Sequence, residues 1–167
     1  IERIRGLRPA TVVLFSFWAT PTLPDREATL RALDETAAAA LAAGAGRVVV
    51  AGPSAQWDGL EPTLPANLLR LYREEPYLRA PARMSLGLNP IVRDLDALYA
   101  GHFSGRDRVR YFSAYRALCN AQGCLTRAGA DPYDLVTWDY GHLTTSGATF
   151  VAERLADEAA LGASGAD

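Results

Sequence analysis

Two apolar runs joined by an amphipathic segment dominate the first third of the chain. Ala10–Trp18 is continuously apolar and rich in β-branched and aromatic residues, as is typical of a central strand in a sheet covered on both faces. Asp25–Ala43 repeats leucine and alanine at helical spacing, with Asp25 as the expected N-cap. Arg47–Ala51 is a second apolar run. This order of elements predicts a β-α-β unit, and therefore a parallel sheet with a right-handed crossover.

The middle of the chain has a less regular pattern. Gln56–Pro90 is rich in proline and has no clean period, so we expect a long excursion with one short helix at about Leu68–Arg73. Excursions of this kind often lie over active sites.

The last part of the chain returns to regular patterns. Ile91–Gly101 is predicted to be a helix with Ile91, Leu95 and Leu98 on its buried face. Asp107–Phe112 is predicted to be a third strand, and Thr149–Ala160 a final helix. The whole pattern predicts a three-layer α/β/α fold with a parallel sheet, whose active site lies beyond the carboxyl ends of the strands.

Composition limits the function classes. The net charge of -2 and the pI of about 5.7 argue against a nucleic-acid partner, because phosphate binding needs a basic surface. No apolar run reaches the roughly 18 residues of a membrane helix. We expect one domain over residues 1–167, and the start at Ile1 rather than Met leads us to expect the C-terminal part of a longer chain.

Cys119 and Cys124 are the only cysteines of the chain. A zinc site would need two more ligands, and a redox pair would favour Cys-x-x-Cys before a helix. The Asn-Ala-Gln-Gly segment between the two cysteines suits a turn closed by a disulfide, which would indicate an oxidising compartment. Two buried free thiols are the alternative.

The candidate chemistry lies in Trp138–Ala148, where Asp139 and His142 stand in an Asp-x-x-His spacing before a polar turn and a helix. A carboxylate that reaches the Nδ1–H of a histidine holds the ring as a general base. The simpler interpretation is that Asp139 ends a strand and His142 caps the next helix.

The motif Asp-x-x-His-Leu-Thr-x-x-Gly-Ala before the last helix resembles the final conserved block of SGNH (GDSL-type) hydrolases. The strand from Asp107 and the cysteine-flanked loop make the chain most similar to the extracytoplasmic SGNH domains fused to acyltransferase-3 membrane proteins. That resemblance implies an SGNH, flavodoxin-like fold and O-acetylation of lipopolysaccharide, peptidoglycan or another surface glycan. It implies that His142 is the general base and that Asp139 orients it, with no metal or cofactor.

The chain departs from the family pattern in two places. It contains no Gly-Asp-Ser, so we expect the first strand and the nucleophile block to lie upstream of Ile1. The block that carries the oxyanion-hole asparagine corresponds to Ser16–Thr20, which has no Asn. Trp18 and Thr20 occupy that neighbourhood and are the candidate substrate-binding residues, with Trp18 able to stack on a sugar or acyl group. A core position for Trp18 is the alternative.

The expected function is O-acyl transfer to a cell-envelope carbohydrate through a serine acyl-enzyme, on the periplasmic side of a bacterial membrane. The expected partner is a membrane acyltransferase domain fused upstream. A free esterase and a non-catalytic glycan-binding module are the alternatives. Ser54 is a weak candidate nucleophile, because Gly-Pro-Ser lacks the Gly-x-Ser-x-Gly elbow. Ser146 is assigned to turn chemistry, and His102 to a surface helix end without a nearby acid.

Overall fold

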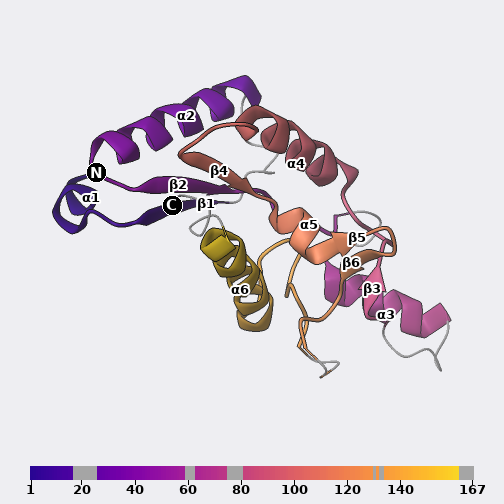
Figure 1. Cartoon of the computed structure of the whole chain (residues 1–167). Coiled ribbons are helices and arrows are strands. Elements are labelled where there is room, and N and C mark those ends of the chain that lie inside the picture. The colour runs from indigo at the N-terminus through magenta and orange to yellow at the C-terminus, as the bar shows by residue number, and fades with distance from the viewer. Residues whose placement is uncertain (17–25, 59–62, 75–80, 130, 132–133, 162–167) are drawn as a thin grey trace. The chain divides into compact units, whose positions relative to one another are not determined.

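The computed structural model describes residues 1–16, 26–58, 63–74, 81–129, 131 and 134–161 of the 167-residue chain (Figure 1). These residues form two compact units, the first Ile1–Pro53 with Arg93–Ser113 and the second Ser54–Val92 with Ala114–Asp167. Each unit has its own three-stranded sheet, and the single domain expected over residues 1–167 stays a prediction. In the described part of the chain, no helix is both long and apolar enough to cross a membrane.

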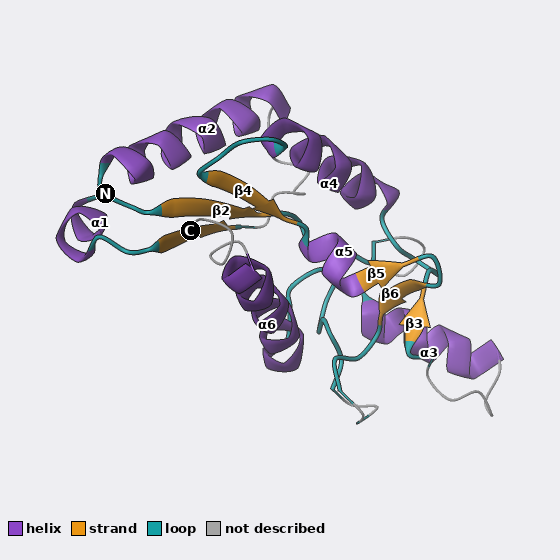
Figure 2. Ribbon diagram, viewed as in Figure 1, coloured by secondary structure: helices purple, strands orange, loops and turns teal. Residues whose placement is uncertain are grey.

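The first unit contains the predicted parallel sheet. Its strands are β1 (Thr11–Phe15), β2 (Arg47–Ala51) and β4 (Val109–Phe112), and they pair in parallel in the order β1-β2-β4 (Figure 2). Helix α2 (Arg26–Ala42) connects the first two strands, which confirms the β-α-β unit, and a short helix α1 (Glu2–Leu7) precedes β1. The structure places β2 in the centre of this sheet, whereas the sequence predicted β1 there.

Helices α2 and α4 (Pro90–Phe103) pack on the same face of this sheet (Figure 1). The buried residues of this core come from both helices and the central strand, and include Leu30, Leu33, Ala37, Ala40, Val48, Val50, Tyr99 and Phe103. The prediction for the buried face of α4 is wrong in part: Leu95 is buried, but Ile91 and Leu98 are 50% and 39% exposed. The helix is rotated so that Val92, Leu95 and Tyr99 face inward, a set that also satisfies the helical period.

A buried carboxylate fixes α4 against the end of the sheet. Asp96 is 2% exposed and accepts hydrogen bonds from Tyr111 Oη at 2.7 Å and Ser113 Oγ at 2.6 Å. A Cβ on Gly52, the residue after β2, would lie 1.9 Å from Tyr111 Oη. Glycine at this position therefore makes room for the tyrosine to reach Asp96.

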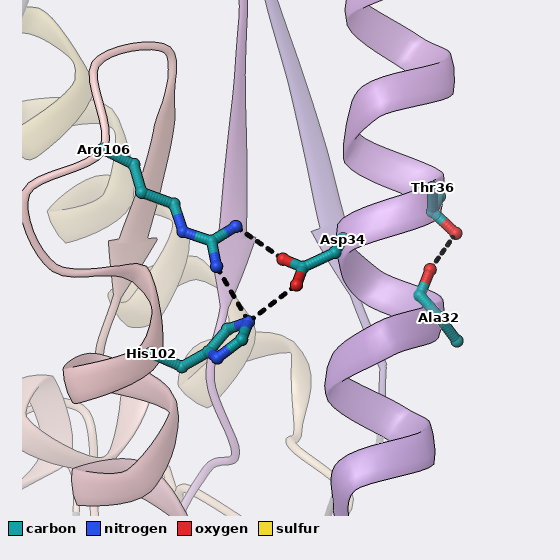
Figure 3. Close-up of polar contacts among 5 residues, drawn as sticks. All are labelled: Ala32, Asp34, Thr36, His102 and Arg106. Atoms are coloured by element: carbon teal, nitrogen blue, oxygen red, sulfur yellow. Dashed lines mark hydrogen bonds and ion pairs between the residues drawn. The ribbon is translucent and has the colours of Figure 1, made fainter.

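A second polar cluster joins α2 to the end of α4 (Figure 3). Asp34 contacts His102 Nε2 at 2.9 Å and Arg106 Nη1 at 2.5 Å, and Arg106 Nη2 lies 2.9 Å from the same imidazole nitrogen. Partial burial would raise the pKa of Asp34, but the hydrogen bonds and charges of Arg106 and His102 lower it below its usual value. The expectation that His102 has no nearby acid is wrong, because Asp34 comes from a distant part of the sequence.

The second unit is built from short elements. Its small antiparallel sheet has the order β3-β6-β5, and its helices are α3, α5 and α6. Their bounds are β3 (Arg83–Met84), β5 (Cys119–Asn120), β6 (Gly123–Leu125), α3 (Leu64–Glu74), α5 (Ala114–Leu118) and α6 (Thr145–Leu161). Helix α3 is longer than the predicted Leu68–Arg73, and strands of two or three residues leave no periodic signal in the sequence.

Cys119 and Cys124 form a disulfide across β5 and β6, where they are directly paired, as the sequence predicted. Arg83 Nη1 donates to Leu118 O at 2.8 Å and to Gly123 O at 3.0 Å, so β3 is tied to both ends of the cysteine hairpin. The disulfide and the arginine therefore hold together the three short strands of this sheet.

We expect thiol titration of the denatured, unreduced protein to find no free thiol, and titration after reduction to find both cysteines. Replacing both by serine should lower the free energy of unfolding by about 2 kcal/mol, because the bond closes a short loop in the unfolded chain. Chemical denaturation under non-reducing conditions measures this loss. Two reactive thiols in the unreduced protein, or equal stability of the serine variant, would contradict the prediction.

Candidate active site

The candidate site lies in the loop Trp138–His142 of the second unit. An extended segment ending in Val136 and Thr137, both 0% exposed, leads into it. An isolated bridge pairs Thr137 with Leu143 on the far side of the loop, and Trp138 N donates to His142 O at 3.3 Å. The loop is therefore a closed turn whose two ends are fixed to each other.

The Asp139 carboxylate organises this turn. Its Oδ1 accepts hydrogen bonds from the backbone N–H of Gly141 at 2.8 Å and of His142 at 2.7 Å. Its Oδ2 lies 2.6 Å from His142 Nδ1. The predicted contact between the two side chains is thus present, and the aspartate holds both the backbone and the ring of the histidine.

These contacts determine the charge of Asp139 and the tautomer of His142. Partial burial would raise the pKa of Asp139, but the two backbone hydrogen bonds and the imidazole outweigh it and lower that pKa below its usual value. The group is therefore a carboxylate at neutral pH, and a carboxylate only accepts hydrogen bonds. The proton of the neutral imidazole must then be on Nδ1, which puts the basic lone pair on Nε2, as a general base requires.

Three successive backbone carbonyls anchor the loop to residues 54–64. Asp139 O accepts from Leu64 N at 3.5 Å, Tyr140 O from Trp57 N at 2.7 Å, and Gly141 O from Ser54 Oγ at 3.4 Å. Ser54 is 8% exposed, and its hydroxyl donates to the main chain of the loop. This bond gives Ser54 a positioning role, in keeping with its weak sequence signal as a nucleophile.

The residues after His142 begin helix α6. Thr144 Oγ1 accepts from Gly147 N at 3.0 Å, which makes Thr144 the N-cap, and the same hydroxyl donates to Leu135 O at 2.5 Å. The helix therefore begins at Thr145, earlier than the predicted Thr149. Ser146 donates to Asp134 Oδ1 at 3.2 Å in the first turn.

Gly147 lets the helix approach the extended segment closely. A Cβ on this residue would lie 2.2 Å from Val136 O, a distance that no side chain tolerates. The Thr-x-x-Gly part of the motif thus has a structural role: it fixes the start of α6 against the chain that leads to Asp139.

The side chains of the loop differ in exposure. The Asp139 side chain is 18% exposed and that of His142 53%, so the carboxylate is shielded while the imidazole is open to solvent. Two aromatic rings flank the imidazole. Trp138 lies with its ring centroid 5.9 Å away at an interplanar angle of 26°, and Tyr140 lies edge-on at 5.5 Å and 73°.

The predicted substrate-binding residues Trp18 and Thr20 lie outside the described residues, so their roles stay predictions. Trp138 and Tyr140 were not predicted as site residues, although aromatic residues on both sides of Asp139 are visible in the sequence. Across the described segments, no cluster of three or more His, Cys, Asp or Glu side chains is placed to hold a metal ion.

We expect Gly147→Ala to lower the free energy of unfolding by about 2 kcal/mol, because the added methyl group forces the helix away from Val136. Gly101→Ala in α4 is the matched control, since its Cβ would meet nothing within 4 Å. That change should instead raise stability by up to about 1 kcal/mol through helix propensity. Chemical denaturation of both variants checks this, and equal effects of the two would contradict it.

The lowered pKa of Asp139 predicts a pH-dependent stability. Its hydrogen bonds contribute fully above the unfolded pKa of about 4 and are lost as pH falls through the lower folded value. We therefore expect Asp139→Asn to reduce the slope of stability against pH on the acid side, measured by urea unfolding at a series of pH values. Asp34→Asn, which removes the other carboxyl with a lowered pKa, should reduce the slope separately. An unchanged slope in Asp139→Asn would contradict the assignment.

Comparison with known proteins identifies the family of the chain. Residues 1–157 match the profile of the family described as "SGNH domain (fused to AT3 domains)". The structure resembles the periplasmic domain of a lipopolysaccharide acetyltransferase from Salmonella ser. Paratyphi A, with 29% identity and a TM-score of 0.77. The alignment covers 94% of this chain and 59% of that domain. No curated protein sequence matches significantly. The chain therefore belongs to the SGNH domains of the kind fused to AT3 domains.

Proposed function

We propose that this chain supplies the general base for O-acyl transfer to a cell-envelope carbohydrate. The observation that carries the proposal is the Asp139–His142 pair, with the imidazole Nδ1 2.6 Å from the carboxylate Oδ2. Family membership supports acyl-transfer chemistry, and the similar Salmonella domain is part of a lipopolysaccharide acetyltransferase.

In the proposed mechanism, His142 Nε2 takes the proton of a serine hydroxyl as the serine oxygen attacks the acyl carbonyl. The tetrahedral intermediate collapses to a serine ester, and the imidazolium returns the proton to the leaving group. In the second step, His142 takes the proton of a sugar hydroxyl, which attacks the ester and regenerates the serine. Asp139 stabilises the imidazolium in both steps. The serine would come from outside residues 1–167, because this sequence has no Gly-Asp-Ser.

The same base would also activate water, so ester hydrolysis is the competing reaction of this centre. His142 is 53% exposed, which favours access of either acceptor. Transfer then depends on a carbohydrate that displaces water from the imidazole. The partner we propose is an AT3 membrane domain of the same protein, which would deliver the acyl group.

We propose an extracytoplasmic location for this domain. The disulfide between Cys119 and Cys124 suits an oxidising compartment, since cytosolic thiols are kept reduced. The similar Salmonella domain is periplasmic, which supports the same location.

In the full-length protein, we expect His142→Ala to lower kcat/KM for 4-nitrophenyl acetate about 1000-fold or more, because the serine then lacks its base. Asp139→Asn should also cause a large loss, since an amide would not hold the imidazole in the required tautomer. Release of nitrophenolate and transfer of acetyl to envelope polysaccharide are the two measurements.

His102→Ala is the control, because it removes the other histidine of the chain. We expect its kcat/KM to stay within about twofold of the unaltered protein, because the Nε2 of His102 already contacts Asp34 and Arg106. Undiminished turnover in His142→Ala would show that another group is the base. An inactive but folded unaltered protein that binds polysaccharide would favour the non-catalytic alternative.

A further inference from the structure

Trp138 is a large aromatic side chain exposed to solvent beside the candidate base. It is 63% exposed, whereas its neighbour Thr137 is fully buried. Tryptophan buries more apolar surface than other side chains and is enriched where proteins bind ligands. The exposed indole beside the candidate base is therefore a candidate surface for binding a ligand.

The orientation of the indole shows which surface is available. One side of Trp138 lies near the His142 ring, at a small interplanar angle of 26°. The high exposure of Trp138 must therefore come largely from its other face and its edges. A ligand on that face would leave the contact between the indole and the imidazole in place.

The position of Trp138 is fixed by the same turn that orients the histidine. Its backbone N–H donates to His142 O at 3.3 Å, and the preceding residue is bridged to Leu143. The distance between the indole and the imidazole is therefore set by the backbone, with little ordering left to occur on binding. Such preorganisation favours affinity for a ligand that spans both rings.

Resting on the function proposed above, we propose that Trp138 stacks against one pyranose ring of the acceptor carbohydrate and thereby holds the neighbouring sugar of the same chain at His142. A pyranose presents a face of C–H groups with partial positive charge, which matches the negative face of an indole. Its hydroxyl groups project from the rim of the ring. A carbohydrate chain held on Trp138 would therefore keep the hydroxyl groups of its next sugar near the imidazole, whose ring centroid lies 5.9 Å from that of the indole.

In this role Trp138 acts in only one of the two steps of the proposed reaction. Formation of the acyl-enzyme needs the base but no sugar, whereas transfer needs the sugar to exclude water from the same base. Trp138 is thus a positioning residue for the acceptor, and its loss should divert the acyl group to water. A tryptophan that merely supports the His142 ring would affect both half-reactions equally.

The test uses the full-length protein and polysaccharide released from the cell envelope of the source cells, freed of acyl esters by mild alkali. Hydrolysis of 4-nitrophenyl acetate and acetyl transfer to this polysaccharide are measured together for Trp138→Ala. We expect the ratio of transfer to hydrolysis to fall about tenfold, with a higher KM for the polysaccharide. Trp138→Phe, which keeps an aromatic face, should recover much of the ratio.

Leu69→Ala is the matched control, because Leu69 is an apolar residue of the same unit that is 59% exposed. It should leave the ratio unchanged. Should Trp138→Ala fail to fold, Trp138→Leu carries the test, since leucine keeps apolar volume but has no aromatic face. An equal fall in hydrolysis and transfer, or an unchanged ratio and KM, would overturn the proposal.

Equilibrium binding of the same polysaccharide distinguishes this proposal from the proposed function. If the protein binds the polysaccharide through Trp138 but transfers no acetyl group, the result would support the stacking role and contradict the proposed acyltransferase function. Binding that is equally strong in Trp138→Ala would overturn the stacking role even if transfer occurs.

Discussion

The Asp139 carboxylate is the contact on which the candidate site depends. One of its oxygens accepts two backbone N–H groups and the other contacts the imidazole, so a single side chain sets both the turn and the ring. Removing that charge would release the turn, the tautomer and the orientation of His142 together. As at the N-terminal cap of a helix, a side-chain oxygen accepts hydrogen bonds from backbone N–H groups two and three residues later. Here the second of those N–H groups belongs to His142.

Around this contact, the second unit supplies hydrogen bonds that hold the loop by its main chain. Three donors from residues 54–64 reach three successive carbonyls of the loop, and Thr144 joins the loop to helix α6. A loop held mainly through its main chain keeps its path while its side chains face solvent. This explains how His142 and Trp138 can be exposed and still be well positioned.

Whether a feature could be predicted from the sequence depends on whether neighbouring residues carry its signal. The strand–helix–strand unit was predictable because each of its elements has its own periodic pattern, and the Asp139–His142 contact because the two residues are three positions apart. The contact of His102 with Asp34 depends on packing between two helices far apart in sequence. The hydrogen bond between Asp96 of α4 and Tyr111 of β4 likewise joins two separate elements, and no local pattern predicts it. The exposure of Trp138 could not be predicted either, because an aromatic residue near a strand is usually expected in the hydrophobic core.

The close approach of Gly147 to Val136 has a consequence for how such domains diverge. Because the two main chains nearly touch there, a side chain at this position would push α6 away from the segment that leads to Asp139. We therefore expect related domains to keep a glycine at this position, even where the exposed residues of the loop differ.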